Sequence, residues 1–395
     1  MQITLKPDRH VPIVAGHPWV FSEAIAKSDP AEAGEIVTVL ASDGRALGLG
    51  TFNPLTSIRV RMLTANPEEK IDADYFARRL KSLDEWKRSR LPAHTDGYRV
   101  VHAEADGIPG LILDRYANTF VFQLHTAGME RLRAPILEAI EQTFAPKNVV
   151  ERSDVEVRKQ EGLKDKPVAV HKGQIEELVV FEEAGLKFLA DVLHGQKTGF
   201  FLDQRQARIR VGELARGRRV LNLFGYTGAF SVHAAKGGAE FVTTVDVSRP
   251  ALELAQKNFE LNKLDPEDES RCQFLEADVM DLLRDDQLPG APYDLIVCDP
   301  PAFAKHEKDL QQALKAYTDL NAACFRLLQP GGLLVTSSCS GRLDPDAFRN
   351  LLRLASGRAH RDVRILDWFG QPMDHAERLA YPEGRYLKTA VLEVR

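Results

Sequence analysis

Apolar and polar positions alternate in a different way in each half of the chain. In the second half, short apolar runs at residues 220–224, 241–246, 273–276, 293–299 and 332–336 are separated by stretches of helical period. The clearest helices are expected at about residues 250–262 and 309–328, and two last strands near 363–368 and 385–394. Regular alternation of strand and helix is typical of a doubly wound, Rossmann-like α/β sheet with helices on both faces.

In the first part of the chain, strand-like runs follow one another at shorter intervals. β-type runs at residues 34–40, 46–52 and 57–63 are separated by turn signals, which predicts a small β-barrel or sandwich. A helix over 72–91, several strands and a second helix at about 130–144 then indicate an α+β unit that ends near a charged loop, 158–166. We therefore predict a multidomain chain with domains at residues 1–68, 69–182 and 183–395.

Some side chains in these elements fit more than one environment. The helix over 72–91 should bury a stripe of Phe76, Leu80, Leu83 and Trp86 and expose a basic face. Arg59 and Arg61 are expected on the face of their strand opposite the core. For them, and for the basic run of Arg205, Arg208, Arg210, Arg216, Arg218 and Arg219, solvent and nucleic-acid phosphates stay open as alternatives.

A glycine-containing turn gives the first sign of chemistry. The apolar run at 220–224 breaks at Gly225, passes Gly228 and continues into a helical pattern, as at the entry to a nucleotide-like ligand site. Asp246 ends the next apolar run, where an acid can accept hydrogen bonds from ribose hydroxyls. No third glycine completes G-x-G-x-x-G, so a nucleoside without a pyrophosphate, such as that of S-adenosylmethionine (SAM), fits better than a dinucleotide.

Two more turns follow later strands of the same sheet. The strand at 293–298 leads into Asp299-Pro300-Pro301-Ala302-Phe303, where consecutive prolines stop the ladder and form a stiff turn. The strand at 332–336 leads into Ser337-Ser338-Cys339-Ser340. Because ligands of open parallel sheets bind outside the carboxyl ends of the strands, we expect these turns to converge on the glycine turn.

Together these motifs resemble a known family. The chain is similar to class I SAM-dependent methyltransferases, specifically large-subunit ribosomal RNA methyltransferases that form 5-methylcytosine and carry an N-terminal PUA domain. The matching motifs are Leu223-Phe224-Gly225-Tyr226-Thr227-Gly228, Asp246, Asp299-Pro300-Pro301-Ala302-Phe303, Ser338-Cys339-Ser340, Gly195-Gln196-Lys197-Thr198-Gly199-Phe200-Phe201-Leu202-Asp203-Gln204-Arg205 and His17-Pro18-Trp19-Val20-Phe21. Core packing is the simpler interpretation of Trp19 and Phe21 themselves. The resemblance spans nearly the whole chain and implies a PUA-like RNA-binding domain, a middle domain, and a methyltransferase domain that ends in an antiparallel strand pair.

The resemblance also implies a cofactor, a substrate and a set of site residues. SAM would be the cofactor and 23S rRNA the partner, and a homodimer stays open. The residues predicted to bind SAM are Thr198, Phe201, Asp203, Phe224, Gly225, Tyr226, Thr227, Gly228, Asp246, Val247, Ser248, Asp278 and Asp299. Pro300, Pro301 and Phe303 are predicted to contact the substrate base. For Asp278 a helix N-cap is the alternative interpretation, and both roles can hold at once.

Cys339 is the predicted nucleophile, with Asp299 as the second catalytic residue. C5 of cytosine is a weak nucleophile, and a thiolate that adds to C6 moves electron density onto C5, provided that the base is flipped out of its stack. Other 5-methylcytosine enzymes use a second cysteine for product release, but here Cys298 precedes Asp299 and alternation turns it into the core. Cys272 and Cys324 are expected to be inert and buried.

Other functions are also compatible with some of these motifs. An acid-Pro-Pro-aromatic turn also serves enzymes that methylate exocyclic amines, and related ribosomal enzymes methylate a guanine ring nitrogen; neither needs Cys339. A non-catalytic RNA-binding protein on the same fold is a third alternative. An NAD-dependent oxidoreductase ranks last, because the third glycine is missing.

The composition excludes several classes of protein. The chain has 395 residues, 44% of them apolar, and no apolar run approaches membrane-spanning length. The N-terminus lacks the apolar core of a secretory signal, so a cytoplasmic protein without membrane contact is expected. Its four cysteines show no zinc-ligand spacing, and we expect no metal. A net charge of −5 argues against a general nucleic-acid binder, so an RNA partner would need local basic patches.

Overall fold

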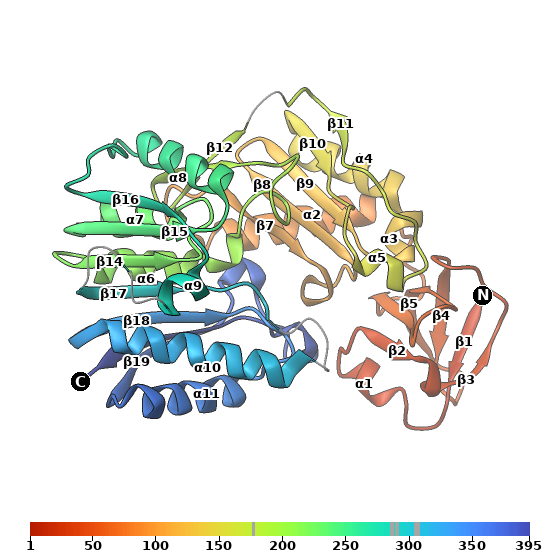
Figure 1. The fold of residues 1–395 in the computed structure, drawn as a ribbon. Coiled ribbons are helices and arrows are strands. Elements are labelled where there is room, and N and C mark those ends of the chain that lie inside the picture. Colours follow the sequence, from red (N-terminus) through yellow and green to blue (C-terminus); the bar gives the residue numbers. More distant parts are fainter. Residues whose placement is uncertain (176–177, 285–287, 289–291, 304–308) are drawn as a thin grey trace. The chain divides into compact units, whose positions relative to one another are not determined.

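The computed structural model describes residues 1–175, 178–284, 288, 292–303 and 309–395 (Figure 1). The chain forms two compact units. Unit 1 comprises Met1–Glu182, Ala190–Leu202 and Met373–Gly384, and unit 2 comprises Glu183–Leu189, Asp203–Pro372 and Arg385–Arg395. The predicted three-domain boundaries stay a prediction. No helix in the described part of the chain is long and apolar enough to cross a membrane.

Unit 1 begins with a six-stranded sheet that confirms the predicted β-rich segment. Its strand order is β2-β6-β5-β4-β1-β3. The strands are β1 Gln2–Leu5, β2 Trp19–Phe21, β3 Ile25–Ser28, β4 Ile36–Leu40, β5 Ala46–Phe52 and β6 Ile58–Thr64, with one short helix, α1 Val11–Val14. Alternate apolar side chains such as Val37, Val39 and Val60 form its core. Trp19 and Phe21 are half-buried, and the Trp19 indole N–H donates to Glu104 Oε1 at 3.1 Å.

Neither alternative considered for Arg61 is correct. Its side chain is buried, and its guanidinium lies 2.7 Å from Glu161 Oε1 and 3.6 Å from Glu104 Oε1. Arg61 therefore forms internal ion pairs and does not present its charge to solvent or phosphate. Arg59 is only half-buried and donates to the carbonyl of Pro54.

The second part of unit 1 is a five-stranded sheet with helices, as predicted for an α+β unit. The strand order is β11-β10-β9-β8-β7. The elements are α2 Ala73–Arg88, β7 Gly97–His102, β8 Leu111–Tyr116, β9 Thr119–Leu124, α3 Ala127–Arg131, α4 Arg133–Phe144, β10 Asn148–Glu151, α5 Val157–Gln160 and β11 Ala169–Lys172. The single helix expected at 130–144 is thus two helices that meet at Leu132, and β11 was missed.

Helix α2 has a side-chain cap at its N-terminus, and its faces differ from those predicted. Asp72 caps the helix by accepting from the Tyr75 N–H, and Phe76 and Leu80 are fully buried. Trp86, expected in the apolar stripe, is 39% exposed, with the Arg90 guanidinium 4.9 Å from its ring. Lys87, expected on the basic face, is completely buried and pairs with Asp106 at 2.5 Å.

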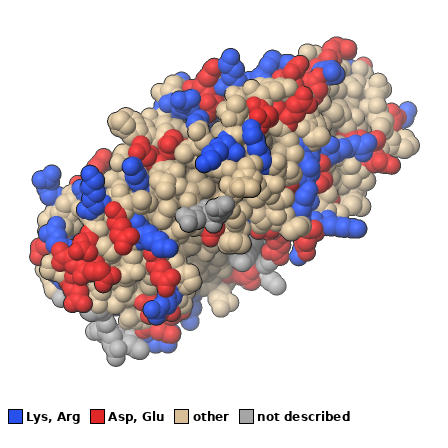
Figure 2. All heavy atoms as spheres, turned by 90° about the horizontal axis from the view of Figure 1, so that it is seen from above, with Lys and Arg blue, Asp and Glu red and all other residues tan. Residues whose placement is uncertain are grey.

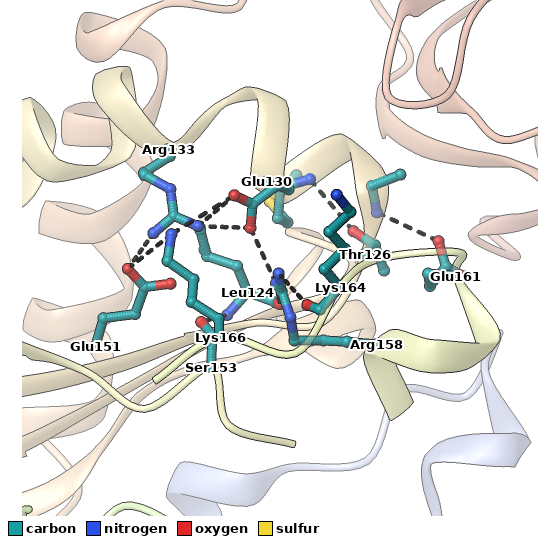
Figure 3. Close-up of polar contacts among 12 residues, drawn as sticks. Leu124, Thr126, Glu130, Arg133, Glu151, Ser153, Arg158, Glu161, Lys164 and Lys166 are labelled. Carbon is teal, nitrogen blue, oxygen red and sulfur yellow. Dashed lines mark hydrogen bonds and ion pairs between the residues drawn. The ribbon is translucent and has the colours of Figure 1, made fainter. Parts of the chain in front are cut away.

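The charged stretch after residue 157 is more ordered than the predicted loop (Figure 3). It begins with α5, and its buried Arg158 donates to the Leu124 carbonyl at 2.7 Å and to Glu130 at 2.9 Å. Arg133 and Lys166 converge on Glu130 and on the buried Glu151. Because each of these acids faces several cations, the charges are compensated within the unit.

Unit 2 contains the predicted doubly wound sheet. The strand order is β16-β15-β14-β17-β18-β20-β19; the first five are parallel, and β20 is antiparallel to both of its neighbours. The strands are β14 Arg219–Leu223, β15 Phe241–Asp246, β16 Cys272–Glu276, β17 Tyr293–Cys298, β18 Leu328–Ser338, β19 Val363–Phe369 and β20 Lys388–Val394. Every strand expected in this half is present, and the last two form the expected antiparallel pair. The chain enters unit 2 along a two-stranded sheet of β12 Val179–Glu183 and β13 Leu186–Ala190.

Helices cover both faces of this sheet (Figure 1). They are α6 Arg205–Leu214, α7 Ala229–Lys236, α8 Arg249–Leu261, α9 Val279–Arg284, α10 Leu310–Leu327 and α11 Pro345–Ala359. On one face, Leu221, Ile296 and Leu334 pack against α9, α10 and α11. On the other face, alternate residues such as Val220 and Val297 pack against α6 and α7. This alternation leaves the strand ends as the place where polar groups gather.

A buried carboxylate joins α6 and α7. Glu183 is completely buried and accepts from the Arg208 guanidinium at 2.6 and 2.7 Å and from His233 at 3.4 Å, and Arg205 lies 3.3 Å away. The solvated-face and phosphate alternatives are therefore both wrong for Arg205 and Arg208. Burial alone would raise the pKa of Glu183, but the Arg208 charge, with His233 and Arg205, lowers it to about 2.

We predict that Glu183→Gln destabilises unit 2 by about 3–5 kcal/mol, because it leaves a buried arginine without its counter-charge. Since folding lowers the Glu183 pKa from 4.5 to about 2, its contribution is complete above pH 4.5 and disappears as the pH falls through 2. Thermal unfolding from pH 7 to pH 2.5 measures this difference. Glu253→Gln, which removes an exposed pair with Arg249, is the matched control and should cost less than about 1 kcal/mol. Equal effects of the two variants at pH 7 would contradict the prediction.

Candidate active site at the carboxyl edge of the sheet

The register of four parallel strands places the predicted turns at one edge of unit 2. Leu223 of β14 is paired with Val245 of β15 and with Cys298 of β17, and Cys298 is paired with Thr336 of β18. Phe224, Asp246 and Asp299 are therefore level with one another, and Cys339 follows the end of β18. Neighbouring strands lie about 4.8 Å apart, so Asp246 and Asp299 are separated by two strand spacings, roughly 10 Å.

The glycine turn after β14 has an unusual backbone. Phe224 and Tyr226 have φ of 57° and 46°, and Gly228 has φ of 72°. A Cβ on Gly225 would lie 2.6 Å from the Thr244 methyl, and one on Gly228 would lie 2.6 Å from the Ala255 Cβ. Positive φ at two non-glycine residues costs of order 1–3 kcal/mol each and persists only where the surroundings impose it. The turn is therefore held in a specific shape at the start of α7.

Buried polar side chains below the turn impose that shape. Asn222 donates to Ser231 Oγ at 2.9 Å, and Ser231 Oγ is 2.7 Å from the Thr244 hydroxyl. Asn258 of α8 donates to the Thr227 carbonyl at 2.8 Å. Sequence reasoning missed these residues; their only signal is polarity within otherwise apolar segments.

Asp246 is suited to bind two hydroxyl groups. One of its oxygens accepts from the Tyr226 N–H at 2.7 Å and the other from the Ser248 N–H at 2.9 Å. Because each carboxylate oxygen can accept two hydrogen bonds, the half-exposed side chain has acceptor capacity left for a ribose diol. Val247, next to it, is 69% exposed and offers an apolar surface, and the Ser248 hydroxyl caps α8.

Asp278 follows the strand beyond Asp246. Its carboxylate accepts from the N–H groups of Met280 and Asp281 at 2.7 and 3.2 Å, so it acts as the N-cap of α9. The side chain is exposed, and a contact with the ligand stays a prediction.

The turn after β17 is oriented by a residue that we did not predict. Gln204 is buried, and its side-chain amide donates to Asp299 Oδ1 at 2.8 Å. Pro300 is buried and Pro301 exposed, so the turn is fixed on one side and open on the other. The half-buried Phe303 ring lies 4.7 Å from the ring of Tyr317, and its stacking on a substrate base stays a prediction.

The four cysteines have the distribution expected from the sequence. Cys272, Cys298 and Cys324 are buried, and Cys339 is half-exposed. A hydrogen bond with Cys324, together with burial, raises the pKa of Cys298 well above its usual value, and burial raises that of Cys272 to about 11. Cys339 is thus the best placed of the four to react.

Tyr317 of α10 connects the turns after β17 and β18. Its buried hydroxyl accepts from Ser338 Oγ at 3.2 Å and is hydrogen-bonded to the Phe303 backbone. Burial raises its pKa to about 12, and the charges of Cys339 and Asp299 contribute in the same direction. Tyr317 therefore links the turn that contains Asp299 to the turn that contains Cys339.

Most predicted site residues lie in unit 2, and two lie in unit 1. Those in unit 2 are Asp203, Phe224, Gly225, Tyr226, Thr227, Gly228, Asp246, Val247, Ser248, Asp278, Asp299, Pro300, Pro301, Phe303 and Cys339. Asp203 accepts from the Tyr386 hydroxyl at 2.8 Å. Thr198 and Phe201 belong to unit 1, where the buried Thr198 hydroxyl donates to Asp114 at 2.6 Å. Their predicted cofactor contacts stay predictions.

Comparison with known proteins identifies two family models. Residues 129–365 match the S-adenosylmethionine-dependent methyltransferase model, and residues 3–65 match the PUA-like domain model. Relatives named ribosomal RNA large subunit methyltransferase I include one from Aliivibrio fischeri (strain ATCC 700601 / ES114), 43% identical over 94% of both chains, and one from Escherichia coli O9:H4 (strain HS), 39% identical over 98% of both chains.

Two solved structures share the fold over the whole chain. SMU.776, described as a methyltransferase and solved with S-adenosylhomocysteine (SAH), has a TM-score of 0.85 at 24% identity, and each chain is covered completely. A SAM-dependent methyltransferase from Streptococcus mutans has a TM-score of 0.83, also at 24% identity and complete coverage.

We predict that Asp246→Ala weakens SAM binding at least roughly 10-fold, because hydrogen bonds to a charged group are worth about 1.5–3 kcal/mol each. Isothermal titration calorimetry measures the affinity, and circular dichroism confirms that the variant is folded. Glu253→Gln, on the exposed face of α8, should leave the affinity unchanged. Unchanged binding by Asp246→Ala would remove Asp246 from the cofactor site.

Proposed function

This chain belongs to the family of SAM-dependent methyltransferases and carries a PUA-like domain at its N-terminus, and from that premise we propose that it methylates C5 of a cytosine in 23S rRNA. The coarser part of the proposal, a SAM-dependent rRNA methyltransferase, is supported by relatives that align along nearly the full chain and carry that name. The choice of cytosine C5 depends on Cys339 and its surroundings.

An RNA substrate requires positive charge at particular places. Lys and Arg side chains are interspersed with Asp and Glu on the face shown in Figure 2. This agrees with the net charge of −5 and does not indicate a continuous basic field on that face. We therefore expect binding to depend on local contacts, with the PUA-like domain as one RNA-binding element.

The proposed reaction begins at the sulfur of Cys339. The thiolate adds to C6 of the flipped cytosine, which forms an S–C6 bond and moves the C5–C6 π electrons onto C5. When bound, SAM would supply an electrophilic methyl group to C5 and would leave as SAH. Loss of the C5 proton, directly to solvent or through Asp299, restores the C5–C6 double bond and expels the Cys339 thiolate.

One observation carries the proposal: Asp299 and Cys339 follow the ends of the neighbouring parallel strands β17 and β18, so both lie at the same edge of the sheet. A cytosine between these groups would present its amino group or protonated N3 to the Asp299 carboxylate while C6 faces the sulfur. Gln204 fixes one Asp299 oxygen at 2.8 Å, which supports an orienting role for this carboxylate. Cys298 is fully buried, so product release in this scheme relies on elimination of Cys339 alone.

We predict that Cys339→Ala reduces methyl transfer at least roughly 10³-fold while SAM affinity is retained, because only the covalent step is lost. Transfer of tritiated methyl from SAM to rRNA from a deletion strain measures activity, and calorimetry measures affinity. Cys272→Ala is the control and should stay active. It removes a buried thiol at the amino end of β16, whereas the candidate site lies at the carboxyl ends of the strands. Full activity of Cys339→Ala would reject the thiolate mechanism and point to methylation of an exocyclic amine or a ring nitrogen.

We also predict that 23S rRNA from a strain without this gene lacks one methyl group. Nuclease digestion followed by mass spectrometry should identify the loss on cytosine, and tandem fragmentation should place it on the ring carbon. Plasmid-borne wild-type protein should restore the mark, whereas Cys339→Ala should not. A lost methyl on a guanine, or no loss at all, would contradict the proposal.

A further inference from the structure

A buried lysine lies beside the candidate nucleophile. Lys388 is the first residue of β20 and is paired with Ser338, the last residue of β18. Its side chain is only 2% exposed. The ammonium donates to the Ser340 carbonyl at 2.5 Å and to the Tyr386 carbonyl at 2.8 Å. Lys388 is therefore paired with the residue before Cys339 and hydrogen-bonded to the residue after it.

The surroundings of this ammonium differ from those of the other fully buried lysine discussed above. Lys87 is compensated by the Asp106 carboxylate at 2.5 Å. Within the described residues, Lys388 forms no ion pair with a carboxylate, and its two hydrogen-bond acceptors are neutral carbonyls. Burial of an ammonium group whose only partners are neutral carbonyls is energetically unfavourable. An anionic group near Lys388 would reduce this energetic cost.

We propose that the Lys388 ammonium is the counter-charge that holds Cys339 in its thiolate form. Lys388 is thus a positioning residue that acts through Cys339 and does not itself touch the substrate. The consequence for catalysis rests on the proposed function, but the charge pairing of Lys388 and Cys339 does not.

The electrostatics of the site agree with this geometry. Burial lowers the pKa of Lys388 to about 8, while the negative charges of Cys339 and Asp344 raise it. Coupling between two titrating groups is reciprocal, so an ammonium that is stabilised by the thiolate stabilises that thiolate equally. The other titratable groups that act here are Tyr317, which stays neutral with a pKa of about 12, and Asp299, which acts on Tyr317.

Two acids also act on the side chains around Cys339: Asp344 acts on Lys388, and Asp299 acts on Tyr317. Carboxylates near a thiol disfavour its ionisation, because two negative charges repel each other. Reactive cysteines generally lie beside a lysine, an arginine, a protonated histidine or a helix N-terminus. Cys339 follows the end of a strand, so in this part of the described chain the Lys388 ammonium takes that role.

The test measures the thiol directly and requires neither RNA nor SAM. The full-length protein is alkylated with iodoacetamide between pH 5 and pH 10, and the rate at Cys339 is followed by peptide mass spectrometry. Lys388→Gln removes the charge but keeps a donor for the two carbonyls, and Lys388→Arg keeps the charge. Thermal unfolding confirms that each variant is folded.

In wild-type protein we expect the alkylation midpoint below the value of about 8.5 for a free cysteine. Lys388→Gln should move the midpoint upward by at least about one pH unit and slow alkylation at pH 7 by about 10-fold, whereas Lys388→Arg should stay close to wild type. A wild-type midpoint at or above 8.5, or identical profiles for wild type and Lys388→Gln, would overturn the inference. Failure of the proposed function has a different signature, because it appears as methyl transfer by Cys339→Ala and leaves these profiles unaffected.

Discussion

The candidate site depends on the hydrogen-bonded register of β14, β15, β17 and β18. β14 and β17 end at the same level, β15 ends one residue later and β18 two residues later, so the residues that follow these strands gather at one edge. A slip of one residue in β17 would exchange the positions of Cys298 and Asp299 and turn a carboxylate into the core. The sheet is buried on both faces, and this makes such a slip costly. The packing that stabilises the fold therefore also sets which side chains reach the edge.

Buried polar side chains below this edge also hold the glycine turn in place. Asn222, Ser231 and Thr244 replace apolar side chains in the core below the glycine turn, where unpaired polar groups would be destabilising. Paired with one another, they hold the turn in a conformation that two non-glycine residues adopt at positive φ. Asn258 extends the same support from α8 to Thr227. The turn therefore has a defined conformation before any ligand binds, so binding costs less conformational entropy.

The sequence predicted the elements of unit 2 well, because strand and helix periods and the glycine and proline turns are local signals. It also located Asp246, Asp299 and Cys339 at strand ends. It failed where a charge is neutralised by a partner far away along the chain, as for Arg208 with Glu183, Arg61 with Glu161 and Lys87 with Asp106. A basic residue in a polar pattern looks exposed, and only the folded chain shows that a carboxylate meets it. Gln204, Tyr317 and Lys388 were missed because the groups that they contact, Asp299, Ser338 and the Ser340 carbonyl, lie far away along the chain.

The closing strand β20 brings one of these missed residues, Lys388, to the candidate site. In a doubly wound sheet the parallel strands deliver their carboxyl ends to the site, whereas β20 runs the other way and delivers its first residue there. Asp246, Asp299 and the ionised Cys339 all contribute negative charge at this edge of the sheet. An antiparallel strand next to β18 can place a side chain level with Ser338 without a loop of its own, and here that side chain is the ammonium of Lys388. The reversal of direction at β20 thus supplies positive charge at the point where the proposed chemistry requires a thiolate.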